Sequence, residues 1–343
     1  MAVITVLGAG AMGSALTRPL VEAGWQVRLW GSIYDDVILD AIDAGQVHPT
    51  LKETISPAVT TFRAGQLAQA VNQAQVVVIS VASGAVVSVL EQVGPYLGDV
   101  ESLWLTSKGF WQTETEVELL TEAIKQIAKT KGINLPPLVA IAGPVKASEC
   151  ASAKPTATVF ACRDYELAKR YAKTVTTPNY SVTPSQDEIG VEVCAALKNI
   201  YAIALGIADG MSAADEQPRD NLRAAIFVQA VAEMASICHA LGGDLQTAYG
   251  LAGMGDLQLT STAGRSRLYG HAVGAGQNPR QALEQMQSQG LTIEGSPAAL
   301  IAHQLVQQLG LNAPLLEAVY QMLHGHVDDA RALICAVALG VDA

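Results

Sequence analysis

The sequence predicts an α/β fold, in which an N-terminal domain with a mostly parallel sheet is followed by an all-helical C-terminal domain. Three observations lead to this fold class. The chain has 343 residues, more than the ~250–300 residues at which a single hydrophobic core stops growing. In the first half, short β-rich runs alternate with stretches of helical periodicity, which is the pattern of βαβ units around a parallel sheet. After about Ser185 the strand patterns stop and only helical ones continue.

Apolar, β-rich runs are the expected strands of the first half. They are Val3–Leu7, Gln26–Trp30, Val76–Val81, Ser102–Thr106, Leu138–Ala142, Ala157–Ala161 and Tyr180–Thr183. Most are separated by stretches with helical spacing of apolar residues, such as Ala11–Ala23, Glu114–Thr130 and Asp164–Thr174. Helices placed between parallel strands in this way cover both faces of the sheet.

The second half reads as a series of helices. The expected helices are Ile189–Met211, Asn221–Leu241, Pro279–Gln289, Ser296–Leu309, Leu315–Leu323 and Ala330–Val341. The polar stretch Ser212–Asp220 is expected to form a loop between the first two of them. The Pro184-Ser185-Gln186 turn marks the boundary, so we predict a dinucleotide-binding domain at residues 1–185 and a helical substrate-binding domain at residues 186–343.

The composition excludes several classes of protein. Hydrophobic residues make up 50% of the chain and charged residues 15%, which is too apolar for wholesale disorder. Lys plus Arg number 21 and Asp plus Glu number 32, and 21 − 32 gives a net charge of −11. An acidic excess of this size argues against binding nucleic acid. The five cysteines are scattered without a CxxC pair and the six histidines lack metal-ligand spacing, so neither disulfides nor a metal site are expected.

Neither a targeting segment nor a membrane span is expected. The chain begins MAVITVLGAG, with glycines where a signal peptide would have its apolar stretch. The most apolar region, Ala74–Leu90, contains Gly84 and several polar residues. It therefore reads as a buried strand followed by a helix, rather than as a span of ~20 apolar residues. Together with the scattered cysteines, these features favour a soluble protein of the reducing cytoplasm.

A glycine-rich turn near the N-terminus has the pattern of a dinucleotide-binding loop. Gly8, Gly10 and Gly13 form G-x-G-x-x-G directly after the first expected strand, at the start of the first expected helix. Gly8 would permit the tight turn, Gly10 the approach of a pyrophosphate, and Gly13 close packing of helix on sheet. The helix N-terminus would supply free N–H groups to the phosphates. The alternative is an ordinary glycine-rich turn, but the context favours a Rossmann-like domain.

The choice between NAD and NADP stays open. An acidic residue at the end of the second strand bonds the ribose 2′-hydroxyl of NAD, whereas a basic residue accommodates the 2′-phosphate of NADP. This chain has Trp30-Gly31-Ser32-Ile33 there, with neither. Asp35 and Asp36 come later and are expected to begin the next helix.

Lys198 is the one cationic side chain between Lys173 and Arg219, in an otherwise apolar expected helix. Glu192 lies six residues earlier, off the i,i+3 and i,i+4 positions of an easy intrahelical pair. Burial among apolar neighbours favours the neutral amine, which suits proton transfer to or from a carbonyl or alcohol. The alternative is a lysine whose charged end reaches the surface.

Three further stretches carry polar groups beside turns or strand ends. Lys108 lies just past an expected strand, at the edge where open α/β sheets bind ligands. Gly143-Pro144 ends another strand and can bring backbone N–H groups close to a substrate. Asp256, Thr260 and Arg265 occur within ten residues of one glycine-rich stretch, which is either a ligand site or a solvated loop.

Together these residues resemble the NAD(P)-dependent sn-glycerol-3-phosphate dehydrogenases. The resemblance runs from about residue 3 to 325 through ordered motifs: GAGAMGSAL, SKG (107–109), AGPVKASE (142–149), GVEVCAALKNIYAIALGIADG (190–210), GLAGMGDLQLTST (250–262), GRSR (264–267) and IEG (293–295). It implies reversible oxidation of sn-glycerol 3-phosphate to dihydroxyacetone phosphate with NAD or NADP, at a site between a Rossmann-like and a helical domain. It also implies a homodimer that supplies the backbone of glycerolipids.

The resemblance implies a role for each matching residue. Lys198 matches the catalytic general acid/base, with Lys108 and Asp256 as its partners around the reacting carbon. Substrate-binding roles are implied for Lys108, Gly143, Asn199, Thr260, Gly264, Arg265 and Ser266. Cofactor-binding roles are implied for Gly8, Ala9, Gly10, Ala11, Met12, Gly13, Ser32, Lys108, Ala147, Arg265 and Glu294. Arg265 would hold the substrate phosphate by bidentate hydrogen bonds.

The chain departs from the family pattern at several positions. Ser266 replaces the usual Asn, Val145 replaces the Ser of Gly-Pro-Ser, Ala82 replaces a common Pro, and the 212–220 loop looks longer. These changes bear on individual substrate contacts and leave the two lysines and Asp256 in place. Two alternatives to the family's reaction stand beside it. One is a related two-domain dehydrogenase for another small anionic hydroxy or keto compound, and the other is a non-catalytic protein that senses NAD(P).

Overall fold

The computed structural model describes residues 2–113, 116–325, 327 and 329–341. Its chain forms two compact units. The first comprises Met1–Trp111 and Leu119–Glu192, and the second comprises Gln112–Glu118 and Val193–Ala343. The chain finally leaves the first unit after Glu192, inside a helix, and not at the turn expected near residue 185.

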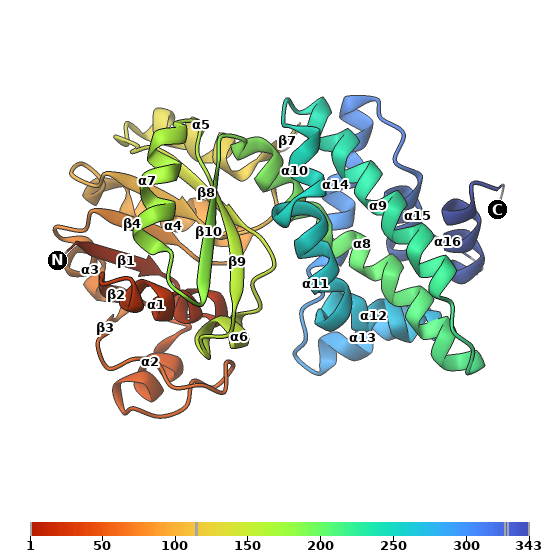
Figure 1. Cartoon of the computed structure of the whole chain (residues 1–343), viewed down its shortest axis with the longest axis horizontal. Helices are drawn as coiled ribbons and strands as arrows, with labels where there is room; N and C mark the ends of the chain where they lie inside the picture. Colours follow the sequence, from red (N-terminus) through yellow and green to blue (C-terminus); the bar gives the residue numbers. More distant parts are fainter. Residues whose placement is uncertain (1, 114–115, 326, 328, 342–343) are drawn as a thin grey trace. The chain divides into compact units, whose positions relative to one another are not determined.

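The first unit contains an eight-stranded sheet in the order β10-β9-β8-β5-β4-β1-β2-β3 (Figure 1). Its strands are β1 Val3–Leu7, β2 Gln26–Trp30, β3 Thr60–Phe62, β4 Val76–Ile79, β5 Ser102–Leu105, β8 Leu138–Ala142, β9 Thr156–Ala161 and β10 Tyr180–Ser185. The β8–β9 pair is antiparallel and the other neighbouring pairs are parallel, which confirms the expected sheet. Each expected run forms a strand, and the edge strand β3 is additional. Because β10 continues through Ser185, the expected turn at Pro184-Ser185-Gln186 begins only at Gln186.

The strand order reverses beside β1, where the chain builds outward in both directions. Val6 of β1 lies opposite Leu29 of β2 on one side and Val78 of β4 on the other. All three side chains are fully buried, as expected for a parallel sheet that is covered on both faces. At such a point of reversal, the carboxyl ends of the strands leave a crevice in which α/β proteins bind ligands.

Helices cover both faces of this sheet. They are α1 Ala11–Glu22, α2 Asp36–Asp43, α3 Leu67–Val71, α4 Val86–Val93, α5 Leu120–Lys131, α6 Ala147–Ala151 and α7 Tyr165–Val175, with short 3₁₀ turns at Ala64–Gln66, Ser83–Ala85 and Gly94–Tyr96. One core joins the sheet to α1, α6 and α7, and it includes Leu16, Cys150 and Tyr171. The other joins the sheet to α3, α4 and α5, and it includes Leu90 and Ile124. Figure 1 shows α7 lying across the first of these faces.

A separate two-stranded sheet, β6 Phe110–Gln112 with β7 Val117–Leu119, corrects one expected helix. That helix was expected over Glu114–Thr130, but it begins only at Leu120, and Glu114 lies outside the described residues. Val117 and Leu119 are buried on either side of the half-buried Glu118, which is the period of a strand. The helical spacing of apolar residues that predicted the longer helix had continued across this short strand.

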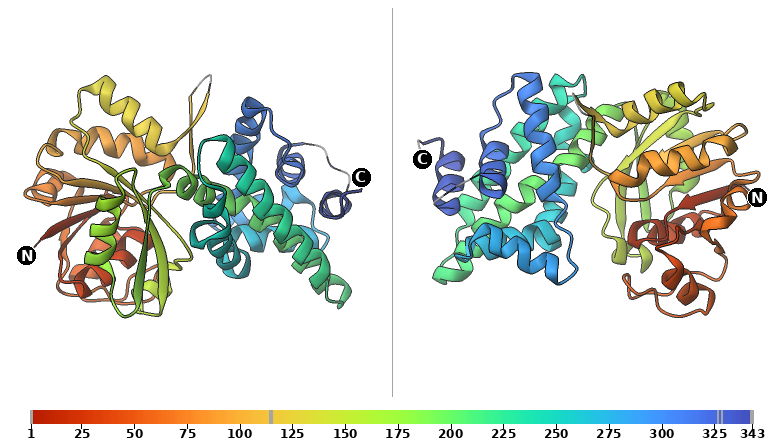
Figure 2. Two further views of the ribbon diagram at one scale, coloured as in Figure 1. Left: turned by 45° about the horizontal axis from the view of Figure 1, so that its top comes forward. Right: turned by 180° about the vertical axis from the view of Figure 1, so that it is seen from behind.

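Apart from Gln112–Glu118, the described part of the second unit consists of helices and their connections (Figure 2). The helices are α8 Glu188–Asp215, α9 Asp220–Ala240, α10 Leu245–Tyr249, a π-helical turn Leu251–Gly255, α11 Asp256–Ala263, α12 Arg265–Gly274, α13 Pro279–Ser288, α14 Gly295–Leu309, α15 Pro314–His324 and α16 Ala330–Leu339. One expectation needs correction. The loop Ser212–Asp220 is shorter than expected, because α8 continues to Asp215. The glycine-rich stretch at 250–262, for which a solvated loop was the alternative to a ligand site, is mostly helical.

Two of the described helices, α8 and α9, are long and apolar enough to cross a membrane by length and composition. The most apolar window of α8 is 94% buried inside the protein, and that of α9 is 44% buried. Burial on this scale explains the apolar sequence of α8, because core helices of globular proteins are apolar all round.

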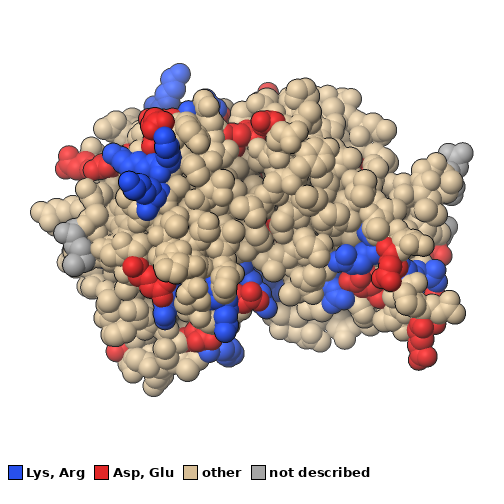
Figure 3. All heavy atoms as spheres, viewed as in Figure 1, with Lys and Arg blue, Asp and Glu red and all other residues tan. Residues whose placement is uncertain are grey.

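Charged side chains on the face drawn in Figure 3 lie in small groups that mix acidic and basic residues. Ion pairs follow the same pattern. A guanidinium nitrogen of Arg63 lies 2.9 Å from an oxygen of Asp40 and 2.7 Å from one of Asp43, and Arg170 lies 3.1 Å from Glu101. Because the two signs are interspersed, that face carries no large field of one sign.

Candidate active site

The glycine-rich loop joins β1 to α1 in the way that its sequence predicts. Gly8 has φ = 113°, and its N–H donates to the Trp30 carbonyl oxygen at 2.8 Å. A Cβ on Gly8 would lie 2.5 Å from the Ser80 carbonyl oxygen, and one on Gly13 would lie 2.0 Å from the Gly8 carbonyl oxygen. Only glycine fits such a turn and such close packing of α1 on the sheet.

Gly10 differs from the other two glycines, because a Cβ built on it would meet no heavy atom within 4 Å. Its backbone faces open space, and as the N-cap residue of α1 it has no side chain with which to cap the helix. The first intrahelical bond runs from the Ser14 N–H to the Gly10 carbonyl oxygen at 3.0 Å, so the N–H groups of Ala11 and Met12 point out of the helix end. These groups fit a dinucleotide, since a helix N-terminus with free N–H groups attracts a pyrophosphate.

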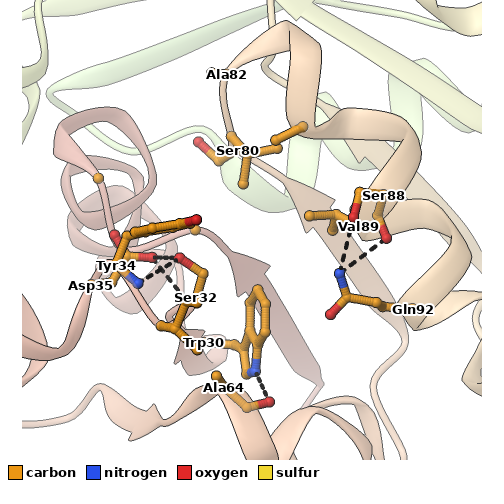
Figure 4. A pocket seen from close by; sticks show the side chains of 15 residues that line it. Trp30, Ser32, Tyr34, Asp35, Ala64, Ser80, Ala82, Ser88, Val89 and Gln92 are labelled. Atoms are coloured by element: carbon orange, nitrogen blue, oxygen red, sulfur yellow. Dashed lines mark hydrogen bonds between the residues drawn. The ribbon is translucent and has the colours of Figure 1, made fainter.

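A cavity of about 480 Å³ opens at the carboxyl ends of β1, β2 and β4 (Figure 4). Gly8 and Gly10 line it after β1, Ser32 and Tyr34 after β2, and Ser80 after β4. The cavity therefore lies at the crevice beside β1. It brings together three of the residues predicted to bind the cofactor: Gly8, Gly10 and Ser32. Lys108, Gly143 and Ala147 belong to the same unit and are not among the residues that line this cavity.

The other predicted residues of the first unit follow strand ends. Lys108 lies between β5 and β6, and Ala147 is the first residue of α6. Gly143 follows β8 with φ = 145°, and a Cβ on it would lie 2.9 Å from the Thr158 Cα of β9. Val145 packs against the core of this unit, which explains an apolar residue where many members of the family have serine.

Lys198 and Asp256 form the most buried ion pair of the second unit's described residues. Lys198 of α8 is 7% exposed and Asp256, the first residue of α11, is 0% exposed. The Lys198 Nζ lies 2.5 Å from the Asp256 Oδ1. A carboxylate this close stabilises the charged ammonium, so apolar burial alone, on which the sequence argument relied, gives an incomplete account of Lys198. The partner stands 58 residues further along the chain, which is why helical spacing did not reveal it.

Glu294 connects two predicted substrate-binding residues. Its Oε2 accepts a hydrogen bond from Asn199 Nδ2 at 2.9 Å, and its Oε1 lies 3.0 Å from an Arg265 guanidinium nitrogen. The side chains of Arg265 and Glu294 are 47% and 57% exposed. Because Asn199 directly follows Lys198 on α8, the structure brings Asn199, Arg265 and Glu294 together beside the lysine's place in the helix.

The start of α12 carries the remaining predicted residues. Gly264 precedes the helix, and its N–H donates to the Thr260 carbonyl oxygen at 2.9 Å. As the N-cap residue, Gly264 has no side chain with which to cap this helix. Ser266 is 2% exposed, and its hydroxyl accepts a hydrogen bond from the Gly295 N–H at 3.3 Å. The serine thus fills a buried position between α12 and α14, which accounts for a residue smaller than the family's asparagine.

Sequence reasoning missed several residues that line this cavity, including Tyr34, Asp35 and Gln92. Tyr34 and Asp35 had one available signal, because they follow β2 at the same sheet edge as the glycine-rich loop. Gln92 comes from the last turn of α4, and nothing in the sequence pairs it with that loop. In the part of the chain that the structure describes, no group of three or more His, Cys, Asp or Glu side chains has the arrangement of metal ligands.

Comparisons with known proteins cover both units. Residues 3–168 match the family described as "NAD-dependent glycerol-3-phosphate dehydrogenase N-terminus", and residues 187–333 match the corresponding C-terminus. The chain is 35% identical to the NADP(+)-dependent glycerol-3-phosphate dehydrogenase of Archaeoglobus fulgidus, over 94% of this chain and 95% of the relative. It is 34% identical to the glycerol-3-phosphate dehydrogenase [NAD(P)+] of Symbiobacterium thermophilum, over 94% and 89%.

A solved structure agrees with these relatives. The crystal structure of glycerol-3-phosphate dehydrogenase from Coxiella burnetii superimposes with a TM-score of 0.84 at 29% identity, covering 98% of both chains. Sequence and structure therefore agree over nearly the whole length of the chain. The chain belongs to the NAD-dependent glycerol-3-phosphate dehydrogenase family and is an NAD(P)-dependent oxidoreductase.

Proposed function

We propose that this chain interconverts sn-glycerol 3-phosphate and dihydroxyacetone phosphate, with Lys198 as the general acid and base. The observation that carries this proposal is the buried pair of Lys198 and Asp256, 2.5 Å apart. A proton donor enclosed by protein and oriented by a second group is suited to carbonyl chemistry. Asp256 is the positioning residue, since it fixes the direction of the ammonium group and balances its charge.

The pair is well suited to the reduction of the ketone. The ammonium form, which Asp256 stabilises, gives a proton to the oxygen on C2 as negative charge develops there. In the opposite direction the neutral amine takes the proton of the C2 hydroxyl. Lys108 of the first unit is proposed to stabilise the same developing charge.

Arg265 and the start of α12 are proposed to hold the substrate phosphate. The guanidinium can make two parallel hydrogen bonds to a phosphate, and the N–H groups of an uncapped helix N-terminus attract the same charge. The Arg265–Glu294 pair is half exposed, so it contributes little stability and can open when an anion arrives. Asn199, Thr260 and Gly143 are proposed as further substrate contacts.

The coenzyme is proposed to bind at the loop Gly8–Gly13, where the open backbone of Gly10 and the N-terminus of α1 fit a pyrophosphate. When bound, NAD(P) supplies the hydride acceptor or donor of the reaction. Ser32, Ala147 and Glu294 are proposed as further coenzyme contacts. We also propose that the protein is a cytoplasmic homodimer whose product enters glycerolipid synthesis.

Lys198→Arg and Lys198→Ala test the proposal. Arginine keeps the positive charge beside Asp256 but does not release a proton, so it separates the proton transfer from the charge pair. We expect both variants to lose about 10²- to 10⁴-fold in kcat with dihydroxyacetone phosphate. Because the glycine-rich loop belongs to the first unit, the Kd for the reduced coenzyme should stay unchanged in Lys198→Arg.

The outcomes separate the candidate functions. Turnover retained by Lys198→Arg would remove the proposed role of the lysine. Wild-type protein that binds coenzyme but reduces no dihydroxyacetone phosphate would favour a sensor or a dehydrogenase for another substrate. Thermal unfolding of both variants supplies the folding control, because Lys198→Ala removes the cation that lies 2.5 Å from the buried Asp256 carboxylate.

A further inference from the structure

The turn after β2 carries a carboxylate at the cofactor cavity. Asp35 lines the cavity together with Ser32 and Tyr34, and the loop glycines Gly8 and Gly10 line it from the end of β1 (Figure 4). Asp35 directly precedes α2, as the sequence led us to expect. Its side chain makes no capping bond to that helix. The expectation that Asp35 merely begins the next helix therefore describes its backbone and not its carboxylate.

The carboxylate of Asp35 turns back toward the strand end. Its Oδ2 accepts hydrogen bonds from the N–H and the hydroxyl of Ser32, both at 2.8 Å, which Figure 4 shows as dashed lines. The Asp35 N–H donates in turn to the Ser32 carbonyl oxygen at 3.0 Å. Among the described residues, no hydrogen bond reaches Oδ1. Ser32 thus fixes the carboxylate at the cavity and leaves one of its oxygens available.

The cations near this turn do not offset the charge of Asp35. Arg63, which follows β3, lies 2.9 Å from Asp40 and 2.7 Å from Asp43, and it donates to the Asp36 carbonyl oxygen at 3.1 Å. The Nδ1 of the buried His48 accepts hydrogen bonds from two backbone N–H groups, as it would in a neutral ring. Burial also lowers the pKa of His48. At this turn the cavity therefore carries the negative charge of Asp35, away from the N-terminus of α1.

We propose that this chain prefers NAD(H) to NADP(H), and that Asp35, held by Ser32, is the residue that discriminates between them. The inference rests on the proposed use of a nicotinamide dinucleotide. In dinucleotide-binding domains the adenosine ribose lies at the end of the second strand. A free ribose 2′-hydroxyl can donate to the available oxygen of Asp35, whereas a 2′-phosphate places like charges together. The Archaeoglobus fulgidus relative is named for NADP(+), so coenzyme choice would differ between the two proteins.

Calorimetric titration of the full chain with NADH and with NADPH, without substrate, tests this inference apart from catalysis. We expect the wild type to bind NADH at least about tenfold more tightly, and the advantage to shrink with added salt, which screens the repulsion. Asp35→Asn keeps an acceptor oxygen for Ser32 and removes the charge, so the ratio of the two Kd values should fall toward one. Asp36→Asn is the matched control, because it removes a neighbouring carboxylate that does not line the cavity, and it should leave the ratio near the wild-type value.

Each outcome decides something. NADPH bound as tightly as NADH by the wild type would overturn the preference and leave the proposed reaction standing. If Asp35→Asn and Asp36→Asn changed the ratio of the two Kd values equally, the effect would come from the general negative charge of this region and not from Asp35. If the wild type bound neither coenzyme, the proposed function would fail together with this inference. The wild-type ratio tests the preference even if a variant does not fold.

Discussion

Arg265 is held by one carboxylate in the structure, and its proposed task is to exchange that partner for a phosphate. The Arg265–Glu294 pair is 3.0 Å long with both side chains about half exposed, so solvent screens it. A substrate dianion that also meets the N-terminus of α12 offers a stronger interaction than Glu294 does. Glu294 keeps Asn199 as a hydrogen-bond partner when the arginine turns away.

Arg265→Ala should therefore raise the KM for dihydroxyacetone phosphate by about 10- to 100-fold, the loss expected for a charge-assisted hydrogen bond. The KM for unphosphorylated dihydroxyacetone, measured in the same coenzyme-oxidation assay, should change little. Arg280→Ala serves as the control, because Arg280 is an exposed arginine of the same unit that pairs with the exposed Glu284. An equal rise for both substrates would show that Arg265 does not bind the phosphate.

At the scale of single residues, the sequence was informative where chemistry depends on residue type and uninformative where it depends on a distant partner. Lys198 was predicted as a functional residue because a lone cation in an apolar helix is unusual. Its pairing with Asp256 was not derivable from spacing, because the two residues stand 58 positions apart on different helices. Asp35 illustrates a second limit, since a carboxylate before a helix can either cap that helix or fold back, and both conformations have the same sequence.

At the scale of elements, glycines let α12 pack unusually close to α8. A Cβ on Gly270 would lie 2.0 Å from the Ile203 carbonyl oxygen, and one on Gly274 would lie 2.1 Å from the Ile207 carbonyl oxygen. On the facing helix, a Cβ on Gly206 would lie 2.2 Å from the Arg267 carbonyl oxygen. The contact fixes the helix that starts with Arg265 against the helix that carries Lys198. Geometry at the site therefore depends on glycines that contact no ligand.

Gly270→Ala should destabilise the protein by roughly 1–3 kcal/mol, because the methyl group forces the two helices apart. Alanine is the better helix former by about 1 kcal/mol, so a fall in stability would have to come from the packing. The measurement is the midpoint of thermal unfolding, compared with Gly98→Ala, where a Cβ meets no heavy atom within 4 Å. A Gly270→Ala midpoint equal to that of Gly98→Ala, or above it, would contradict this account of the helix contact.

The architecture of the whole molecule was largely predictable, because it follows from periodicity. Alternation of strand and helix patterns predicted the parallel sheet, and the loss of β-rich runs after Ser185 predicted the helical second half. The point at which the chain passes from one unit to the next was not predictable in this way. It lies after Glu192 within α8, and a continuous helix carries no turn signal there.

Glu192 makes the stability of the molecule depend on pH. It is buried in the first unit, where its carboxyl accepts hydrogen bonds from the N–H of Thr121 at 3.0 Å and from its hydroxyl at 2.6 Å. Burial, with a smaller contribution from the nearby Glu188, raises the pKa of Glu192 from its usual 4.5 to about 7, against the effect of these hydrogen bonds. Glu188 itself is ion-paired to Lys125 at 2.8 Å.

A raised carboxyl pKa in the folded state costs stability as the pH rises. Below a pH of about 4.5 both the folded and the unfolded chain hold the proton, and the shift has no effect. Between about 4.5 and 7 the unfolded chain releases the proton while the folded chain keeps it, so unfolding becomes more favourable. Above 7 the full cost is present, on the order of 3 kcal/mol at 1.36 kcal/mol per unit of pKa. Glu192→Gln, which retains an acceptor for the Thr121 N–H and does not ionise, removes this cost.

We therefore expect the stability of Glu192→Gln relative to the wild type to increase as the pH rises from about 5 to 8. The free energies of unfolding of the two proteins should be closest at the acidic end of this range. Thermal and urea unfolding across this range are the measurements. Glu166→Gln, at an exposed glutamate of α7 with a side chain that is 78% exposed, should follow the wild type at every pH. A difference between Glu192→Gln and the wild type that stays constant over the range would mean that Glu192 does not titrate within it. In that case the hydrogen bonds from Thr121, and not burial, would determine the charge of Glu192 in the folded chain.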